Sequence, residues 1–353
     1  MPWGLVPWIV SQAPELPIVR YDIEADWQLL NTCNYRCDYC FFPGEVLGEK
    51  TVRHGTPDEW ANAFSATGLT FLLHLTGGEP SAYPDFVDLC AALTRHHFIS
   101  LNSNLTQASL GDFARRIDPV RVSVINAGLH PDERVRRRGM EIFNRNLALL
   151  HEAGFSVFAS VVATPQVLAN AEEVARQVTV PGLVPVPKLL RGSYRGRTYP
   201  GAYDVAERAA FRAMSRRARS AYGEWRAARS EPPTVDPFAD DDFLDGTPTF
   251  RGTVCAAGSR FVRIEPQGDV FRCGSDTALQ GNILAGTFAP LRGPRPCDSG
   301  YCFYFCRKYT DPKYTHRADA GPRADPPVSG RQSLVPPHLV KRVGTALQRM
   351  LGR

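Results

Sequence analysis

Residues 33–41 have the sequence CNYRCDYCF and follow a short apolar run that predicts the first strand of the chain. Their three cysteines, Cys33, Cys37 and Cys40, have the spacing Cys-x3-Cys-x2-Cys. Three thiolates can hold three irons of a four-iron cluster, which leaves the fourth iron without a protein ligand. An open iron of this kind can bind a substrate or cofactor and pass it an electron. The stretch therefore predicts a redox site rather than a structural metal.

The strand-like run FLLHLT further along the chain ends in Gly77-Gly78-Glu79-Pro80. A glycine pair at a strand end lets the backbone approach a ligand closely, because no Cβ atom stands in the way. The Glu79 carboxylate is an acceptor suited to a protonated amine. The alternative is a plain strand-to-helix turn, since glycine and proline are common turn residues.

Together the two motifs resemble the cysteine loop and the GGEP motif of the radical S-adenosylmethionine (SAM) superfamily. The resemblance extends to the aromatic residue before the last cysteine. It implies that SAM binds the open iron of a 4Fe-4S cluster and is split on reduction into methionine and a 5′-deoxyadenosyl radical. That radical abstracts hydrogen from unactivated C–H bonds. The residues implied to hold the cluster are Cys33, Cys37 and Cys40, and those implied to position SAM are Tyr39, Gly77, Gly78, Glu79 and Pro80.

Length and composition favour an enzyme with one large and one small domain. The chain has 353 residues, and its net charge of +5 gives no strong case for a nucleic-acid partner. The apolar start MPWGLVPWIV contains two prolines and no basic region, so it does not predict a signal peptide. No apolar run is long enough to span a bilayer, which predicts no stable membrane insertion. Nine cysteines in clustered spacings favour metal ligation in a reducing cytoplasm.

Short apolar strands alternate with amphipathic helices through the first part of the chain. One helix begins with a capping box, Thr56-Pro57-Asp58-Glu59. Six β/α units predict an α/β fold whose parallel sheet curls into a partial (β/α)6 TIM-like barrel, as in the radical SAM family. Ligands of such sheets bind at the carboxyl ends of the strands, where both motifs lie. The six strands are predicted at residues 27–30, 70–75, 98–102, 121–125, 156–162 and 183–188.

Polar residues follow the third and fourth of these strands. Ser103, Asn104 and Asn126 are hypothesised to bind SAM, and the alternative is that the asparagines are ordinary turn residues. His130 is a candidate for substrate binding or proton donation. The alternative for His130 is a surface position at the start of a helix, since the following Pro-Asp-Glu is itself a helix-start signal. His74 lies within a strand and is expected to be a satisfied core histidine.

A basic segment follows the sixth strand, and its donors are expected beside the open end of the barrel. Lys188, Arg191 and Tyr194 are candidates for binding a phosphate, carboxylate or sugar-nucleotide group of the substrate. The alternative is a solvated basic loop, because runs of charge usually face water.

Five cysteines lie beyond an acidic, proline-bearing run that predicts a linker. Cys255 and Cys273 flank a predicted hairpin with a glycine in its turn, and CDSGYCFYFC follows at residues 297–306. This arrangement resembles the auxiliary-cluster domain called twitch, which is related to the SPASM domain. The resemblance implies one auxiliary 4Fe-4S cluster, held by Cys255, Cys273, Cys302 and Cys306.

Two points about these cysteines stay open. Cys297 either replaces Cys302 as a ligand or stays free, where its thiol can return a hydrogen atom to a substrate radical. A structural zinc site is the alternative to a cluster, since four thiolates suit zinc equally well.

The predicted organisation has five parts. They are an N-terminal extension at residues 1–24, a radical SAM core at 25–230, a linker at 231–250, a twitch/SPASM-like domain at 251–312 and a Pro/Arg-rich tail with a short basic helix at 313–353.

The sequence thus predicts a cytoplasmic radical SAM enzyme that abstracts hydrogen from a small molecule, such as a sugar or another polar natural-product precursor, with net oxidation. A flavodoxin or ferredoxin is implied as reductant, because splitting SAM needs a donor at roughly −400 mV or below. Three alternatives are a redox-neutral epimerase, a ribosomal-peptide maturase and a non-catalytic zinc or electron-transfer protein. The short segment before the core and the single auxiliary cluster favour a small molecule over a peptide.

Overall fold

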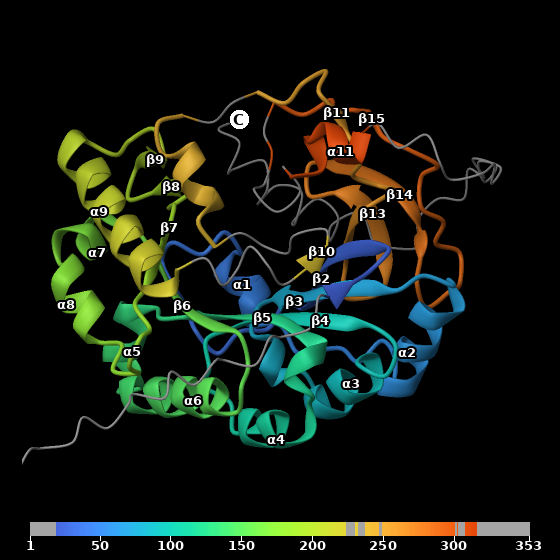
Figure 1. Cartoon of the computed structure of the whole chain (residues 1–353), viewed down its shortest axis with the longest axis horizontal. Helices are drawn as coiled ribbons and strands as arrows, with labels where there is room; N and C mark the ends of the chain where they lie inside the picture. The colour runs from blue at the N-terminus through green and yellow to red at the C-terminus, as the bar shows by residue number, and fades with distance from the viewer. Residues whose placement is uncertain are drawn as a thin grey trace, which may run out of the picture.

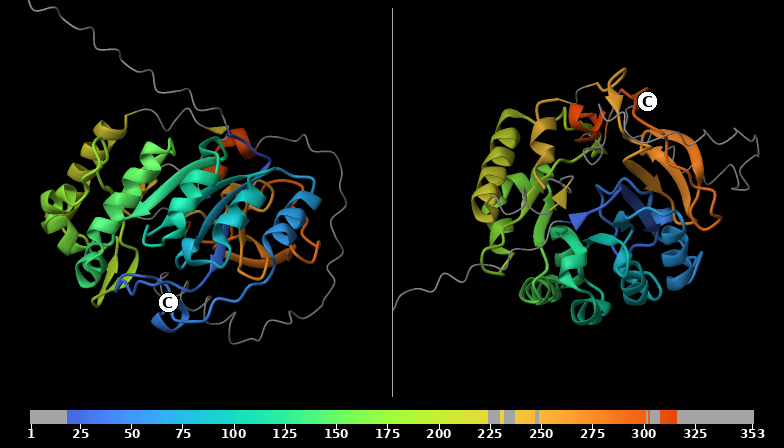
Figure 2. Two further views of the ribbon diagram at one scale, coloured as in Figure 1. Left: turned by 90° about the horizontal axis from the view of Figure 1, so that it is seen from below. Right: turned by 45° about the vertical axis from the view of Figure 1, so that its right-hand side comes forward.

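The computed structural model describes residues 19–223, 230–231, 237–246, 249–300, 302 and 308–315. Its largest sheet has nine strands in the order β14-β13-β12-β2-β3-β4-β5-β6-β7, and the two edge strands are not paired with each other. The six strands β2 to β7 are parallel, and the sheet curls without closing (Figure 2), which confirms the predicted partial barrel. Their bounds are β2 (Ile23–Leu30), β3 (Phe71–Gly77), β4 (Phe98–Ser103), β5 (Val122–Gly128), β6 (Val157–Val162) and β7 (Val186–Lys188).

Helices form a layer outside the parallel strands (Figure 1). The predicted capping box is present, because Thr56 and Glu59 each accept a hydrogen bond from the other's backbone N–H, and it starts α2. A second such box, between Asp204 and Glu207, starts the longest helix, α9. The bounds are α2 (Pro57–Ala66), α3 (Phe86–Leu93), α4 (Ser109–Arg116), α5 (Pro131–Arg137), α6 (Met140–Glu152), α7 (Pro165–Ala169), α8 (Ala171–Arg176) and α9 (Val205–Tyr222).

The two faces of the sheet differ in polarity. On β2 the odd-numbered residues are apolar and pack against the helices, as the contact between Trp27 and Trp60 of α2 shows, with ring centroids 4.6 Å apart. The even-numbered residues Glu24, Asp26 and Gln28 point to the inner face, because successive side chains of a strand alternate. A polar inner face cannot close into a dry core, so the interior of this barrel is suited to hold ligands.

The hairpin predicted between Cys255 and Cys273 is present and extends the main sheet. It is formed by β12 (Phe261–Ile264) and β13 (Asp269–Cys273), with Gly268 at a φ of 94° in the turn, and it is followed by β14 (Asp276–Asn282). Strand β12 lies parallel to β2, with Arg263 opposite Asp26. The C-terminal cysteine region is therefore joined to the barrel by strand pairing.

Smaller elements complete the described chain. The predicted basic loop contains a two-stranded hairpin, and part of the predicted linker is a packed 3-10 turn. The remaining bounds are β1 (Val19–Arg20), α1 (Gly44–Leu47), η1 (Pro80–Ala82), η2 (Pro119–Arg121), β8 (Gly192–Tyr194), β9 (Arg197–Tyr199), β10 (Ser230–Glu231), η3 (Ala239–Phe243), β11 (Val254–Cys255), β15 (Arg295–Pro296), η4 (Lys308–Thr310) and α11 (Pro312–Thr315).

Several predictions fall on residues that the structure does not describe. These are the fifth C-terminal cysteine, Cys306, the basic helix predicted in the tail and most of the predicted N-terminal extension. None of the described helices combines the length and the apolar composition that crossing a bilayer requires.

A buried network around Glu24, near the start of β2, joins the C-terminal segment to the sheet. The Glu24 carboxylate lies 2.6 Å from His74 Nε2 and 2.6 Å from Lys308 Nζ, and it accepts hydrogen bonds from the hydroxyls of Tyr309 at 2.5 Å and Tyr21 at 3.1 Å. Burial alone would raise the pKa of Glu24. The Lys308 ammonium and the His74 imidazole outweigh this effect and lower the pKa to about 2. The expectation that His74 is a satisfied core residue is confirmed.

Replacing Glu24 by glutamine should lower the free energy of unfolding by about 3–5 kcal/mol at neutral pH, because it breaks a buried charge pair from one side. The stabilisation is present above the ordinary pKa of 4.5 and is lost as the pH falls towards 2, since the lowered pKa favours the folded state only while the carboxyl is ionised. Denaturant titration at several pH values measures both effects.

The matched control for this prediction is Glu172→Gln, whose carboxylate forms an exposed ion pair with Arg217. It should change stability little, because exposed pairs contribute little. Equal and small effects of the two substitutions would contradict the role given to Glu24.

Candidate functional site

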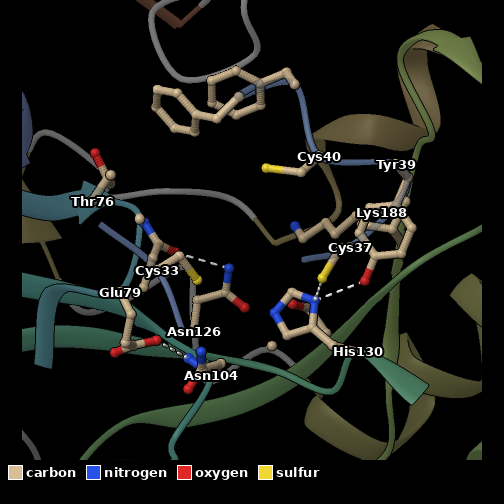
Figure 3. A pocket seen from close by; sticks show the side chains of 18 of the residues that line it. Cys33, Cys37, Tyr39, Cys40, Thr76, Glu79, Asn104, Asn126, His130 and Lys188 are labelled. Atoms are coloured by element: carbon tan, nitrogen blue, oxygen red, sulfur yellow. Dashed lines mark hydrogen bonds between the residues drawn. The ribbon is translucent and has the colours of Figure 1, made fainter. Parts of the chain in front are cut away.

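A cavity of about 440 Å³ lies at the carboxyl ends of the parallel strands. The three cysteines of the loop after β2 line it, together with polar side chains from the inner face of the sheet (Figure 3). This is where ligands of open parallel sheets bind, as the sequence predicts. The polar and charged side chains of the wall include Asp26, Gln28, Thr76, Asn102, Asn126, Ser160, Lys188, Arg191, Asp240 and Arg263.

The cysteine loop is fixed by backbone hydrogen bonds and by an apolar cover. Cys33 N–H donates to the Leu47 carbonyl, and Cys40 N–H to that of Cys37, both at 3.0 Å. Cys33 and Cys40 pack against an apolar cluster that includes Phe42 and Leu47 of α1. An apolar shell around ligating thiolates limits the access of solvent to a bound metal.

The donor set of this loop fits a four-iron cluster. The three thiols come from one loop, line one cavity and form no disulfide. Burial raises the pKa of Cys33 to about 11 and that of Cys37 to about 12, so a bound metal must displace their protons. In the part of the chain that the structure describes, no three Cys, His, Asp or Glu side chains converge as they would on a single metal ion.

Gly77 and Gly78 bring the end of β3 against the residues that precede Cys33. Gly78 N–H donates to the Leu30 carbonyl at 2.9 Å. The φ of Gly77 is 117°, which favours glycine, and a Cβ atom on it would overlap the Leu30 oxygen. A Cβ atom on Gly78 would overlap the Thr32 oxygen. Within the chain, the glycine pair brings two backbone segments together at the base of the cysteine loop. Both glycines also line the cavity, and their predicted close approach to SAM stays a prediction.

Glu79 joins the ends of two strands. Its carboxylate is 1% exposed and accepts hydrogen bonds from the Ser103 hydroxyl at 2.7 Å, Asn104 N–H at 2.7 Å and Ser81 N–H at 3.1 Å. Burial raises the pKa of Glu79, while these donors oppose the shift. Its predicted role as an acceptor for the amine of SAM stays a prediction, because within the chain its oxygens already have these donors.

The three side chains predicted to bind SAM after β4 and β5 differ in their partners. The side chains of Ser103 and Asn104 form hydrogen bonds within the protein. Ser103 donates to Glu79, while Asn104 donates to Asn34 of the cysteine loop and accepts from Thr106 in its own turn. Asn126 donates to Asn102 Oδ1 at 2.9 Å, but its own oxygen is buried and has no donor among the described residues. Since it lines the cavity (Figure 3), Asn126 is the best placed of the three to contact a ligand.

His130 starts α5, as one alternative expects, but it is only partly exposed and lines the cavity. Its Nδ1 atom lies 2.7 Å from the Tyr39 hydroxyl and 3.6 Å from Cys37 Sγ (Figure 3). Burial lowers the pKa of His130 to about 3, so the ring is neutral. These contacts orient Tyr39 beside the cysteine loop, and a role of His130 in substrate binding stays a prediction.

Of the basic-segment candidates, Lys188 and Arg191 line the cavity and Tyr194 does not. Lys188 Nζ donates to the Pro237 carbonyl at 2.5 Å, and Arg191 pairs with Asp240 at 2.9 Å. Both partners belong to the packed part of the predicted linker, which therefore forms one wall of the cavity.

The sequence analysis missed two acidic residues of this cavity. Asp26 accepts a hydrogen bond from the Thr76 hydroxyl at 2.8 Å, and burial raises its pKa. The alternation of polar and apolar residues in IEADWQLL could have identified it. Asp240 is 1% exposed and accepts from Leu189 N–H at 2.6 Å. An acidic run gives no local signal that one of its members is buried.

A second cavity, of about 250 Å³, is lined by four of the five C-terminal cysteines: Cys255, Cys273, Cys297 and Cys302. The antiparallel pairing of β11 with β15 places Cys255 opposite Arg295, which brings Cys297 close. Cys297 and Cys302 both line this cavity, so the choice between them as ligands stays a prediction. Four thiols around one cavity fit a four-iron cluster or zinc by donor type.

The two cavities meet at one turn of the chain. Cys273 ends β13 and lines the second cavity, and the next residue, Gly274, lines the first. Phe261 and Arg263 of the same hairpin also line the first cavity. The C-terminal cysteine region is therefore a wall of the main cavity.

Comparison with known proteins identifies the family. Residues 27–178 match the Radical SAM superfamily. The chain contains a radical SAM domain. As a radical SAM enzyme it uses a 4Fe-4S cluster and SAM. The predicted enzyme class and these cofactors are thereby confirmed.

Two kinds of curated relative resemble this radical SAM chain. Mycofactocin maturase MftC of Mycolicibacterium smegmatis is 27% identical over 275 residues, which cover 73% of this chain and 67% of the relative. PqqA peptide cyclase of Ruegeria pomeroyi is 35% identical over 110 residues, which cover 31% of this chain and 28% of the cyclase. The chain thus matches little more than a quarter of the cyclase's length.

Solved structures share the fold. The structure of anSMEcpe with bound AdoMet superposes with a TM-score of 0.52 at 13% identity, covering 75% of this chain and 76% of that one. A structure of the same protein with AdoMet and the Cp18Cys peptide gives the same TM-score. At this level of identity the likeness confirms the predicted α/β fold alone.

Replacing Gly78 by alanine should reduce SAM cleavage by on the order of 100-fold, because the new methyl group would push the Thr32 backbone and displace the cysteine loop. Deoxyadenosine formation by the reconstituted full chain measures this. Gly111→Ala in α4 is the control, since there the Cβ atom would meet only the flexible end of Arg115. Unchanged cleavage in Gly78→Ala would show that the contact does not position the loop.

Proposed function

We propose that this radical SAM enzyme modifies a peptide by hydrogen abstraction and net oxidation. The observation that carries the proposal is the turn at Cys273 and Gly274, which places a second thiol-lined cavity directly behind the wall of the radical cavity. A second redox centre at that position could accept the electron of a substrate radical. The relatives, one named a maturase and another a peptide cyclase, favour a peptide over the small molecule that the sequence predicts.

The chemistry of the cavity wall agrees with a peptide. Gln28, Asn102 and Asn126 present side-chain amides, which both donate and accept hydrogen bonds as peptide backbone groups require. The wall also contains one acidic side chain, Asp26, and one basic side chain, Arg263, which lie opposite each other on neighbouring strands. We assign Cys33, Cys37 and Cys40 as cluster ligands, and we expect Asn126 to contact SAM or substrate.

The second cavity is assigned an auxiliary 4Fe-4S cluster held by Cys255, Cys273, Cys297 and Cys302. Compared with the sequence prediction, Cys297 is proposed in place of Cys306, which lies outside the described residues. The assignment rests on the four thiols sharing one cavity next to the substrate site. A flavodoxin or ferredoxin is expected to supply the electron that starts each turnover.

The decisive experiment uses the full chain, reconstituted anaerobically with iron and sulfide and reduced in the presence of SAM and the peptides encoded beside its gene. We expect deoxyadenosine to form in step with a peptide product that has lost two hydrogen atoms. Cys33→Ala should abolish both products. Mass spectrometry and chromatography provide the readout.

Other outcomes of this experiment separate the alternatives. A product of unchanged mass that takes up deuterium from heavy water indicates epimerisation rather than oxidation. Deoxyadenosine that forms only with small polar metabolites, and no modified peptide, would refute the peptide substrate and leave the radical SAM class intact.

A triple variant in which Cys33, Cys37 and Cys40 are replaced by alanine distinguishes the two metal sites. It should retain about four irons per chain and the spectrum of one reduced cluster, against about eight irons in the unchanged chain. If the triple variant binds zinc or no metal at all, the auxiliary cluster is wrong.

A further inference from the structure

The cavity lined by Cys255, Cys273, Cys297 and Cys302 contains a buried arginine that neither the sequence motifs nor the proposed chemistry explains. Arg272 is 7% exposed and lines this cavity. Burial of a guanidinium is costly unless its donors are satisfied. Its partners therefore show what the side chain does.

Among the described residues, the Arg272 side chain donates hydrogen bonds to four backbone carbonyls. Nε donates to Ala257 at 3.1 Å, Nη1 to Pro296 at 3.1 Å, and Nη2 to Arg295 at 2.7 Å and to Cys255 at 3.4 Å. The five N–H donors of a planar guanidinium suit such a divergent set of acceptors, which a lysine ammonium cannot reproduce.

These carbonyls belong to the segments that carry the cysteines. One is the carbonyl of Cys255 itself, and another, that of Pro296, directly precedes Cys297 in the chain. Arg272 in turn directly precedes Cys273 on β13. A single side chain thus joins the backbones of three of the four thiol-bearing segments.

Arg272 also forms an ion pair. Its carboxylate neighbour is Asp276, at 3.5 Å and partly exposed. The four carbonyls add partial negative charge around the guanidinium, while Asp276 is the more exposed of the two partners. A cation held beside four thiolates favours the more negative, reduced state of a cluster bound there.

We propose that Arg272 is the positioning residue of the auxiliary site. It assembles the segments of Cys255, Cys273 and Cys297 around the cavity before the cluster binds, and its charge raises the reduction potential of the bound cluster. The inference rests on the auxiliary cluster of the proposed function and adds a residue that holds and tunes it.

The test uses the full chain in the background in which Cys33, Cys37 and Cys40 are alanine, so that only the auxiliary cluster contributes. Arg272→Met removes the donors and the charge, and Arg272→Lys keeps the charge but not the fork of donors. Arg251→Met, at an exposed position near the same region, is the matched control. Loss of iron to a chelator, the midpoint potential from a redox titration followed by electron paramagnetic resonance, and the thermal unfolding midpoint are measured.

Arg272→Lys should lose iron about 10-fold faster than its parent or more, as expected for an outer-shell change, with its potential little changed. Arg272→Met should lose iron at least as fast and shift the potential of the remaining cluster downward. Arg251→Met should match the parent in both. A purely structural role for Arg272 would lower the unfolding midpoint without moving the potential.

The proposal is overturned if Arg272→Met retains iron and potential like the parent. Should Arg272→Met fail to fold, Arg272→Lys decides, because retention of iron at the parent's rate would exclude the positioning role. If the parent background itself assembles no cluster, the auxiliary site fails, and the Arg272 inference falls with it for that separate reason.

Discussion

The alternation of side chains along β2 is the constraint on which the rest of the molecule depends. Apolar residues on one face attach the strand to the helices, and Glu24, Asp26 and Gln28 on the other face create a barrel interior that must be wet or filled by ligand. The strand also has neighbours on both sides, β3 and β12, so it connects the barrel to the C-terminal hairpin. The cysteine loop starts where this strand ends.

Both thiol-lined sites are built by the same principle, in which backbone contacts rather than the cysteines fix the geometry. In the main cavity, Gly78 pairs with the segment before Cys33 and leaves no room for a side chain. In the second cavity, backbone carbonyls converge on the Arg272 guanidinium. In both sites the thiols are thus presented by a framework of backbone contacts.

Local signals predicted the fold and the motif residues well. The capping box at Thr56, the glycine turn at Gly268 and the strand ends carrying the cysteines depend on neighbouring residues only, and sequence shows such features directly. Asp240 and Arg272 depend on segments far away in the chain. The acidic run around Asp240 resembles a solvated linker until β7 packs against it, and Arg272 acquires its role only when β11 and β15 pair.

The pairing of β2 with β12 also has a consequence for biosynthesis. Residue Glu24 lies opposite Phe261, so one side of β2 has no partner until the C-terminal part of the chain has left the ribosome. An unpaired strand edge is prone to association with other chains until its partner is available. Contacts this distant along the chain also form slowly. The nine-stranded sheet therefore becomes complete only after the hairpin of β12 and β13 has been synthesised and has paired with β2.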